Sequence, residues 1–157
     1  MIRIETLIAA PAVVCFDLMR DAGLHTQSMK LSGERAVAGR MTGLFEAGDE
    51  VTWEARHFGI RQRLTSRITR CEPPHLFEDV MVRGAFTSFT HLHRFVEVTG
   101  GTDMTGGTDM IDEFDYVSPL GILGKLADAL FLKRYMRNLL LNRARFLKTE
   151  AERRQAR

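Results

Sequence analysis

Three histidines and two aspartates are the residues of this sequence best suited to carry chemistry. They are His57, His91, His93, Asp79 and Asp112. A histidine paired with a carboxylate can act as a general base, because the carboxylate orients the imidazole and burial tunes its pKa. These five residues are therefore the candidate catalytic residues, although their types and spacing do not define a reaction.

A metal site is an alternative use of the same residues. The spacing His91-Leu92-His93 puts both imidazoles on one face of a strand, and His57 with an aspartate could complete an open zinc site. Residues two apart on a strand lie about 6.5 to 7 Å apart at the backbone, so this spacing alone is a weak metal signal. We therefore expect no metal and no other cofactor.

A third interpretation, which we favour, involves no reaction. The histidines and carboxylates would hydrogen-bond to one another and to buried water, and would form the polar end of a cavity that binds a ligand. The nucleophile motifs GxSxG and SxxK are missing from the sequence. Cys15 and Cys71 lack CxxC spacing, so we expect both to be reduced and Cys15 to be a small buried hydrophobic residue.

The alternation of side chains along the predicted strands indicates which residues face a cavity. Over Glu50–Phe58 the inward set contains Trp53 and His57. Over Ile60–Cys71 a row of arginines faces solvent, so the intervening side chains point inward. The complete inward set is Trp53, Ala55, His57, Gln62, Leu64, Ser66, Ile68, Phe77, Asp79, Met81, Phe89, His91, His93, Phe95, Met110, Asp112, Phe114 and Tyr116. On Leu76–Arg83 the opposite face, with Glu78, Val80 and Val82, is the alternative.

The expected ligand-binding residues are drawn from these faces and from the C-terminal helix. They are Trp53, His57, Leu64, Ser66, Asp79, Met81, Phe89, His91, His93, Phe114, Tyr116 and Met136. Trp53 is the only tryptophan, and its neighbour His57 favours a stacking platform for a ligand over a core filler. His25 and His75, beside a helix and a Pro-Pro turn, are expected at the surface.

The order of predicted elements defines an α+β protein. A strand at Ile2–Ile8 precedes a helix from Pro11 to Arg20 and a short helical piece at Leu24–Met29. Six further strands follow, and the tight connections between the last five make them antiparallel. These strands are Gly33–Ala38, Glu50–Phe58, Ile60–Cys71, Leu76–Arg83, Phe86–Val98 and Asp109–Val117.

The segment after Ser118-Pro119 is expected to be helical. Its apolar stripe changes phase near Leu132, which predicts a short helix over Pro119–Phe131 and a long one over Leu132–Ala151. One face of the seven-stranded sheet needs a cover, and the long helix is large enough to supply it. Three glycine-bearing segments are expected at the mouth of the cavity: Gly39–Gly48, the Gly84 turn and Ser118–Gly121.

A tandem repeat occupies the last strand connection. The hexapeptide TGGTDM occurs at Thr99–Met104 and again at Thr105–Met110. We interpret it as a duplication tolerated at an exposed loop tip, where added length costs little. A phosphate-binding loop would need a lysine and a following helix, which this segment lacks.

Length and charge restrict the class of protein further. The 157 residues, 45% hydrophobic and 27% charged, suit one domain with a substantial core. The sequence contains no apolar run long enough to span a bilayer and no apparent export signal, so we expect a cytoplasmic protein without an integral membrane segment. Nothing in it indicates an oligomer.

The net charge of +2 conceals a basic C-terminus. Residues 133–157 contain nine Lys/Arg and two Asp/Glu. We favour a solvated helix face over a nucleic-acid or membrane site, because the basic residues are spread around the helix and lack interleaved aromatics. An interaction protein that uses this basic helix remains the alternative, and no nucleic-acid partner is expected.

Three local sequences carry a resemblance to a known superfamily. They are IxAPxxVxFxLM at Ile8–Met19, GDEVTWEARHFG at Gly48–Gly59 and SPLGxLG at Ser118–Gly124. With the element order, they resemble the SRPBCC superfamily of START domains, birch-pollen-type allergens and polyketide cyclases, and most closely its bacterial ligand-binding members. The resemblance implies a helix-grip fold with a deep cavity for a small hydrophobic or amphipathic molecule such as a lipid, quinone or polyketide. It also allows a cyclase, dehydratase or hydrolase on the same scaffold, since fold alone does not decide function.

Overall fold

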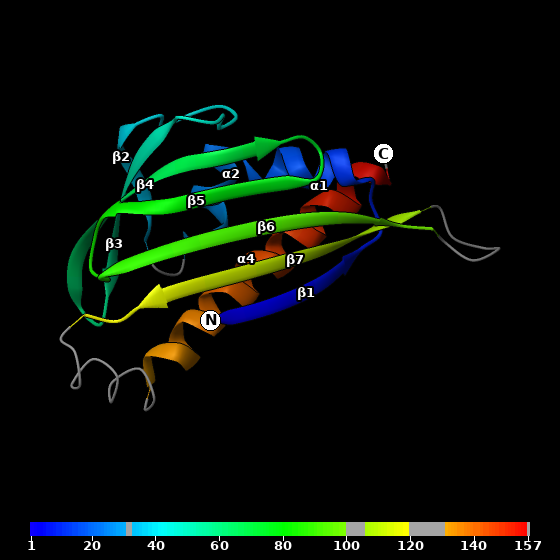
Figure 1. Ribbon diagram of the computed structural model, residues 1–157. Coiled ribbons are helices and arrows are strands. Elements are labelled where there is room, and N and C mark those ends of the chain that lie inside the picture. The colour runs from blue at the N-terminus through cyan, green and yellow to red at the C-terminus, as the bar shows by residue number, and fades with distance from the viewer. Residues whose placement is uncertain (31–32, 100–105, 120–130, 157) are drawn as a thin grey trace.

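A curved antiparallel sheet forms one layer of the molecule (Figure 1). The computed structural model describes residues 1–30, 33–99, 106–119 and 131–156. Within these residues the sheet has seven strands in the order β1-β7-β6-β5-β4-β3-β2. Their bounds are β1 Ile2–Ile8, β2 Arg35–Gly39, β3 Glu50–His57, β4 Ile60–Glu72, β5 Leu76–Arg83, β6 Ser88–Val98 and β7 Gly107–Val117.

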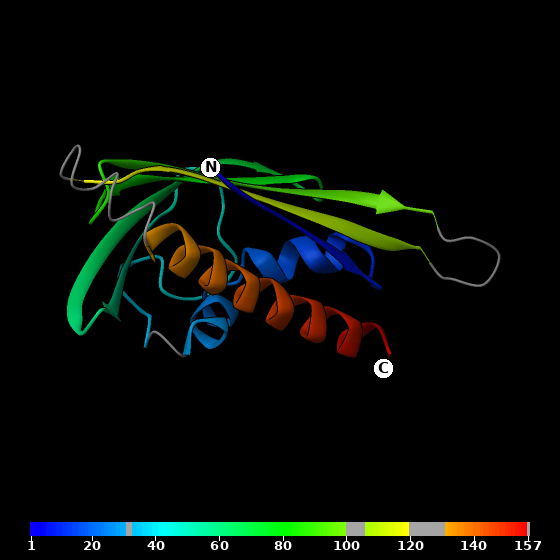
Figure 2. The same ribbon diagram turned by 90° about the horizontal axis from the view of Figure 1, so that it is seen from below.

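The helices form the second layer, on the concave side of the sheet (Figure 2). They are α1 Ala12–Met19, α2 Ala22–Ser28 and the long α4 Lys133–Gln155. The side chain of Asp21 begins α2 by accepting hydrogen bonds from the backbone N–H groups of Gly23 and Leu24, at 2.8 and 3.0 Å. The sheet bends around α4, so that its inner face and the helix enclose the interior.

The solid core lies at the C-terminal end of α4. Phe16 of α1 is fully buried, and its ring packs edge-on against Phe95 at 5.5 Å and Phe77 at 6.4 Å between centroids. Ala144, Leu147 and Ala151 are the buried residues of α4. Because the buried residues of the helix all lie from Ala144 onward, its first half remains available to line a cavity.

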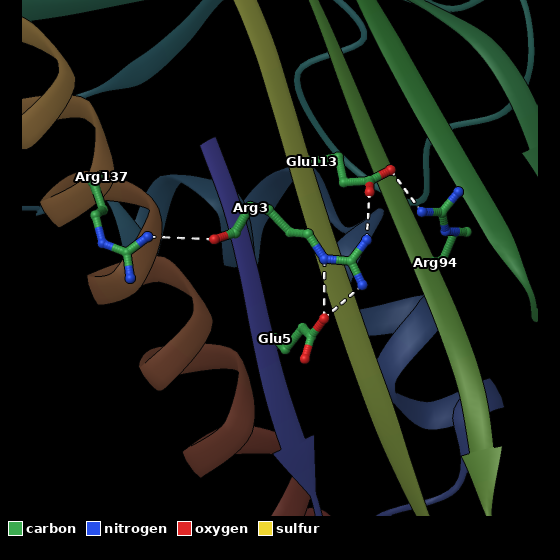
Figure 3. A network of polar contacts seen from close by, with 5 residues as sticks. All are labelled: Arg3, Glu5, Arg94, Glu113 and Arg137. Atoms are coloured by element: carbon green, nitrogen blue, oxygen red, sulfur yellow. Dashed lines mark hydrogen bonds and ion pairs between the residues drawn. The ribbon is translucent and has the colours of Figure 1, made fainter. Parts of the chain in front are cut away.

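A network of ion pairs on the outer face of the sheet joins the edge strand β1 to β7 and β6 (Figure 3). Arg3 on β1 donates to Glu113 on β7 at 2.7 Å and to Glu5 at 2.9 Å, while Arg94 on β6 donates to Glu113 at 2.6 Å. Arg3 and Glu113 are direct cross-strand partners. Arg137 of α4 also reaches the backbone carbonyl of Arg3 at 3.3 Å, which connects the long helix to the edge strand.

The architecture confirms the predicted fold class and the predicted antiparallel order. The long helix begins one residue after the predicted start and continues four residues past Ala151, where Glu150 pairs with Arg153 and Arg154 in the last turn. The last strand begins at Gly107 rather than Asp109, because Gly107 still pairs with Val98. Most of the predicted short helix over Pro119–Phe131, and Thr99–Met104 beyond its first residue, lie outside the described residues.

Two smaller findings complete the fold. Both cysteines are free, and Cys15 is buried as expected for a small hydrophobic side chain. Among the described helices none has the length and the apolar character that crossing a membrane would require.

Candidate functional site

A cavity of about 370 Å³ lies between the sheet and the first half of α4. Its wall is formed by the inner faces of β3 to β7, by residues of α1 and α2, and by residues from Leu132, just before α4, to Arg143 within it. Most of this wall is apolar, with residues such as Phe45, Val51 and Leu139. The volume falls within the range of about 300 to 1,000 Å³ of small-molecule sites.

Most of the predicted ligand-binding residues lie on the cavity wall. They are Trp53, His57, Leu64, Ser66, Asp79, Phe89, His91, Phe114 and Met136. The strand residues among them lie at the positions that alternation predicts to face inward, because each strand presents every second side chain to the interior, and Met136 lies on α4. The three segments predicted at the mouth each border the cavity as well, through Phe45, through Ala85 and Phe86, and through Pro119.

Three predicted residues lie behind the wall instead of on it. Met81 packs against the edge of the core, and Tyr116 lies half-buried with its ring 5.3 Å from those of Phe86 and Phe114. His93 is fully buried, where its Nδ1 hydrogen-bonds to the carboxylate of Asp112. His93 therefore contacts the cavity only through its neighbours.

A polar cluster forms where β5, β6 and β7 lie side by side. The strand register makes Asp79 the direct partner of His91, and His93 the direct partner of Asp112. The rings of His91 and His93 are 4.0 Å apart, and His91 Nε2 is 3.8 Å from Asp112 Oδ1. One donor atom from each of Asp79, His91 and His93 lies within 4.8 Å of the others, a grouping that could hold a metal ion.

Burial sets the protonation of this cluster. Burial lowers the pKa of His91 and of His93 well below the usual value, so both imidazoles are neutral at pH 7. Burial also raises the pKa of Asp79 to about 7, although Arg143 and a hydrogen bond from Ser66 act in the opposite direction. The pKa of Asp112 is raised for the same reason. Asp79 is thus a carboxyl group that holds its proton near neutral pH beside an apolar cavity.

Arg143 is a residue of the cavity wall that the sequence interpretation missed. It extends from α4 to the cavity wall, and its Nη2 reaches only the backbone oxygen of Met19 at 3.4 Å and the sulfur of Met19 at 3.0 Å. Within the described part of the chain no carboxylate forms an ion pair with it. A signal was available, because Arg143 falls four residues after Leu139 and four before Leu147, in the middle of the apolar stripe of the helix.

The prediction that His25 lies at the surface is wrong. His25 lines the cavity and stacks on Trp53, with ring centroids 4.0 Å apart and planes 18° from parallel. Its Nε2 bonds the carboxylate of Glu34 at 2.5 Å. The Asp21 cap turns α2 under the sheet, and this turn brings His25 inside. His75, the other histidine predicted at the surface, is exposed.

His57 lies apart from the histidine cluster. Its Nδ1 hydrogen-bonds the hydroxyl of Tyr135 at 2.7 Å, and burial lowers the pKa of its imidazole. The ring of Tyr135 also packs on Phe58 at 4.6 Å. Phe58 and Phe131 line the cavity but are about half exposed, at 56% and 49%, so the cavity reaches the surface at this point. His57 therefore lies at the rim of the cavity and is not part of the cluster of Asp79, His91 and His93.

The described residues form a helix-grip protein, with a curved antiparallel sheet closed around a long C-terminal helix. Solved structures share this fold over almost the whole chain. TTHA0849 from Thermus thermophilus matches with a TM-score of 0.71 at 19% identity, covering 96% of this chain and 95% of its own. Major latex-like protein 151 from Panax ginseng matches with a TM-score of 0.64 at 14% identity, over 96% of this chain and 95% of its own.

A third match is protein CV1439 from Chromobacterium violaceum, with a TM-score of 0.66 at 11% identity over 96% of each chain. Neither the known protein-family models nor the curated protein sequences contain a match to this chain. At such low identities the common property is the fold. The helix-grip architecture implied by the sequence resemblance is therefore confirmed.

Proposed function

We propose that the protein binds a small, mostly apolar molecule that carries one acidic or carbonyl group. The observation that carries the proposal is Arg143, a guanidinium on the wall of a mostly apolar cavity whose only hydrogen-bond partner among the described residues is Met19. A charged donor in such a place is costly unless an acceptor meets it. A ligand carboxylate, phenolate or carbonyl would supply this acceptor.

The remainder of the wall supports the same class of ligand. Trp53 and Phe89 offer flat apolar surfaces, and Leu139 and Leu140 of α4 offer aliphatic ones. A lipid, a quinone or a polyketide would fit this combination of a large apolar surface and a single cationic contact. The two free cysteines agree with a cytoplasmic setting for such a protein.

The experiment compares ligands that differ only in the polar group. Binding of a medium-chain fatty acid, its methyl ester and its alcohol would be measured by isothermal titration calorimetry, after organic extraction and native mass spectrometry of the purified protein. Arg143→Gln should lower the affinity for the fatty acid by about 10-fold or more, since a hydrogen bond to a charged group contributes roughly 1.5 to 3 kcal/mol. The affinity for the alcohol should fall much less.

Arg145→Gln is the matched control, because Arg145 lies on the same helix and is exposed. Its affinities should equal those of the unmodified protein. A protein that yields no extractable ligand and binds none of the three compounds would contradict the proposal. Equal losses in Arg143→Gln and Arg145→Gln would contradict the assigned role of Arg143.

Acid–base chemistry on the bound molecule is a second candidate function. Asp79 and His91 are direct cross-strand partners and both line the cavity, so a ligand would contact a carboxyl group and an imidazole together. The same native samples test this candidate. Conversion of a bound compound over time, followed by mass, would indicate an enzyme, whereas its recovery unchanged would indicate a binding protein.

A further inference from the structure

Two buried imidazole nitrogens have no hydrogen-bond partner. Among the described residues, His91 Nε2 and His93 Nε2 are the side-chain nitrogen or oxygen atoms left in this state. The two residues are 5% and 0% exposed, so bulk water does not reach these atoms. An unsatisfied buried polar atom costs about 1 to 3 kcal/mol, and a pair of them on adjacent residues of one face points to a missing partner.

The side chains converge more closely than the backbone spacing requires. Residues two apart on a strand lie about 6.5 to 7 Å apart at the backbone. The rings of His91 and His93 nevertheless lean together, with centroids 4.0 Å apart. Asp79 enters from the neighbouring strand as the cross-strand partner of His91, and one donor atom of each residue lies within 4.8 Å of the others.

Asp112 determines which nitrogen of His93 is available. Its carboxylate bonds His93 Nδ1, and an ionised carboxylate can only accept, so Nδ1 carries the hydrogen. The lone pair of His93 is therefore on Nε2, the atom without a partner. A carboxylate behind a histidine is the usual outer support of a metal-binding imidazole, because it fixes the ring and increases its basicity.

We propose that Asp79, His91 and His93 form a binding site for one divalent transition-metal ion, with Asp112 as the positioning residue for His93. Two imidazoles and one carboxylate suit Zn²⁺, whereas Mg²⁺ and Ca²⁺ prefer oxygen donors. Asp79 and His91 line the cavity, so the remaining coordination position faces the space that a ligand would occupy.

The geometry requires a modest adjustment on binding. A tetrahedral zinc ion with bonds of about 2.0 to 2.1 Å holds its donor atoms about 3.3 Å apart, so the present donor atoms must approach by up to about 1.5 Å. The side chains of Asp79 and His91 border open space and can rotate. Asp79 loses its proton when the ion binds, and the carboxylates of Asp79 and Asp112 then balance the charge of the ion. Arg143 is the cation that acts on both of them.

Calorimetric titration of the chelator-treated protein with Zn²⁺, without any organic ligand, tests the proposal. We expect one ion per chain and a higher melting temperature with zinc. His91→Gln and Asp79→Asn should weaken binding by more than about 100-fold, and Asp112→Asn by about 10- to 100-fold with the stoichiometry unchanged. His75→Gln is the matched control, since His75 is exposed, and it should bind as the unmodified protein does.

Two readouts on the unmodified protein make the test independent of variant folding. Zinc should shift the imidazole NMR signals of His91 and His93 but not that of His75, and Co²⁺ should give the visible absorption of a four-coordinate site. Circular dichroism of each metal-free variant checks its fold. No binding, unshifted histidine signals, or full affinity in folded His91→Gln and Asp79→Asn would overturn the proposal and leave the proposed ligand binding untouched.

Discussion

At the residue scale, some residues of the site could be predicted from sequence patterns and others could not. His91 was predictable, because the period of two along a strand fixes the face of each side chain once a row of aromatics has set the register. Asp79 depended on a closer choice between the two faces of its strand. His25 was not predictable, because its position depends on how a helix of seven residues turns beneath the sheet. That turn depends on tertiary packing, which leaves no periodic signal.

His25 gives the stability of the protein a pH dependence. Burial lowers the pKa of His25, with Arg143 acting in the same direction and the Glu34 carboxylate in the opposite one. Below its ordinary pKa of about 6.5 the unfolded chain binds a proton that the folded protein resists. The free energy of unfolding should therefore fall as the pH decreases from about 6.5 to 5, by up to about 1.4 kcal/mol per pH unit for this group.

The test is urea denaturation of the protein and of His25→Gln across this pH range. The glutamine cannot titrate, so the variant should lose part of the acid-side slope while other buried histidines keep theirs. His75→Gln, at an exposed position, should leave the slope unchanged. An identical slope in all three proteins would contradict the assignment to His25.

At the element scale, the antiparallel order of the last five strands and the long helix followed from the sequence with small errors in their ends, whereas the pairing of β1 with β7 did not. The tight connections between strands allow only antiparallel neighbours, and the apolar stripe from Leu132 onward requires one continuous helix. The observed ends of the strands differ from the predicted ones because backbone pairing continues beyond the apolar pattern. Gly107, for example, still pairs with Val98. The cavity depends on something that the patterns do not encode, namely that the buried residues of α4 all lie from Ala144 onward.

The tandem repeat offers a prediction about the β6–β7 connection. Val98 pairs with Gly107, and eight residues lie between them. Deleting Thr99–Met104 removes six of these and leaves Thr105-Gly106 as a two-residue loop, a length that antiparallel hairpins favour. The sheet should remain intact, and the shorter loop should stabilise the fold by about 1 kcal/mol, because closing it costs less entropy.

Chemical denaturation measures this change, and a same-length control separates length from sequence. In the control, Thr99–Met104 is replaced by six glycine and serine residues, which should leave stability close to that of the unmodified protein. Ligand binding should be equal in all three proteins. A deletion variant that loses stability or binding would indicate that the repeat has a role beyond closing the hairpin.

At the scale of the whole molecule, the basic C-terminus is partly neutralised by the protein itself. Arg153 and Arg154 bond Glu150, and Lys148 bonds both Glu152 and the backbone oxygen of Leu7. The oxygen of Glu152 also accepts from the N–H of Ala9, so the end of α4 is attached to the junction after β1. Because these basic side chains are paired within the protein, they do not form a continuous row of unpaired positive charges on the helix.

We therefore expect little attraction to polyanions. Co-sedimentation with phosphatidylserine vesicles and fluorescence anisotropy with duplex DNA should detect no binding that falls steeply between about 50 and 200 mM salt. A charge-reversed variant at Lys133 and Arg134, near the start of α4, serves as the comparison. Strong salt-dependent binding that disappears in this variant would instead support an interaction role for the basic helix.

The stack of His25 on Trp53 gives the molecule an internal optical reporter. Trp53 is the only tryptophan in the chain, it is 5% exposed, and it lines the cavity. Indole emission responds to the polarity and contacts of its surroundings, so all of the intrinsic tryptophan fluorescence arises from the wall of the candidate site. Any molecule that enters the cavity, and any change in the His25 ring beside it, should therefore be visible without a label.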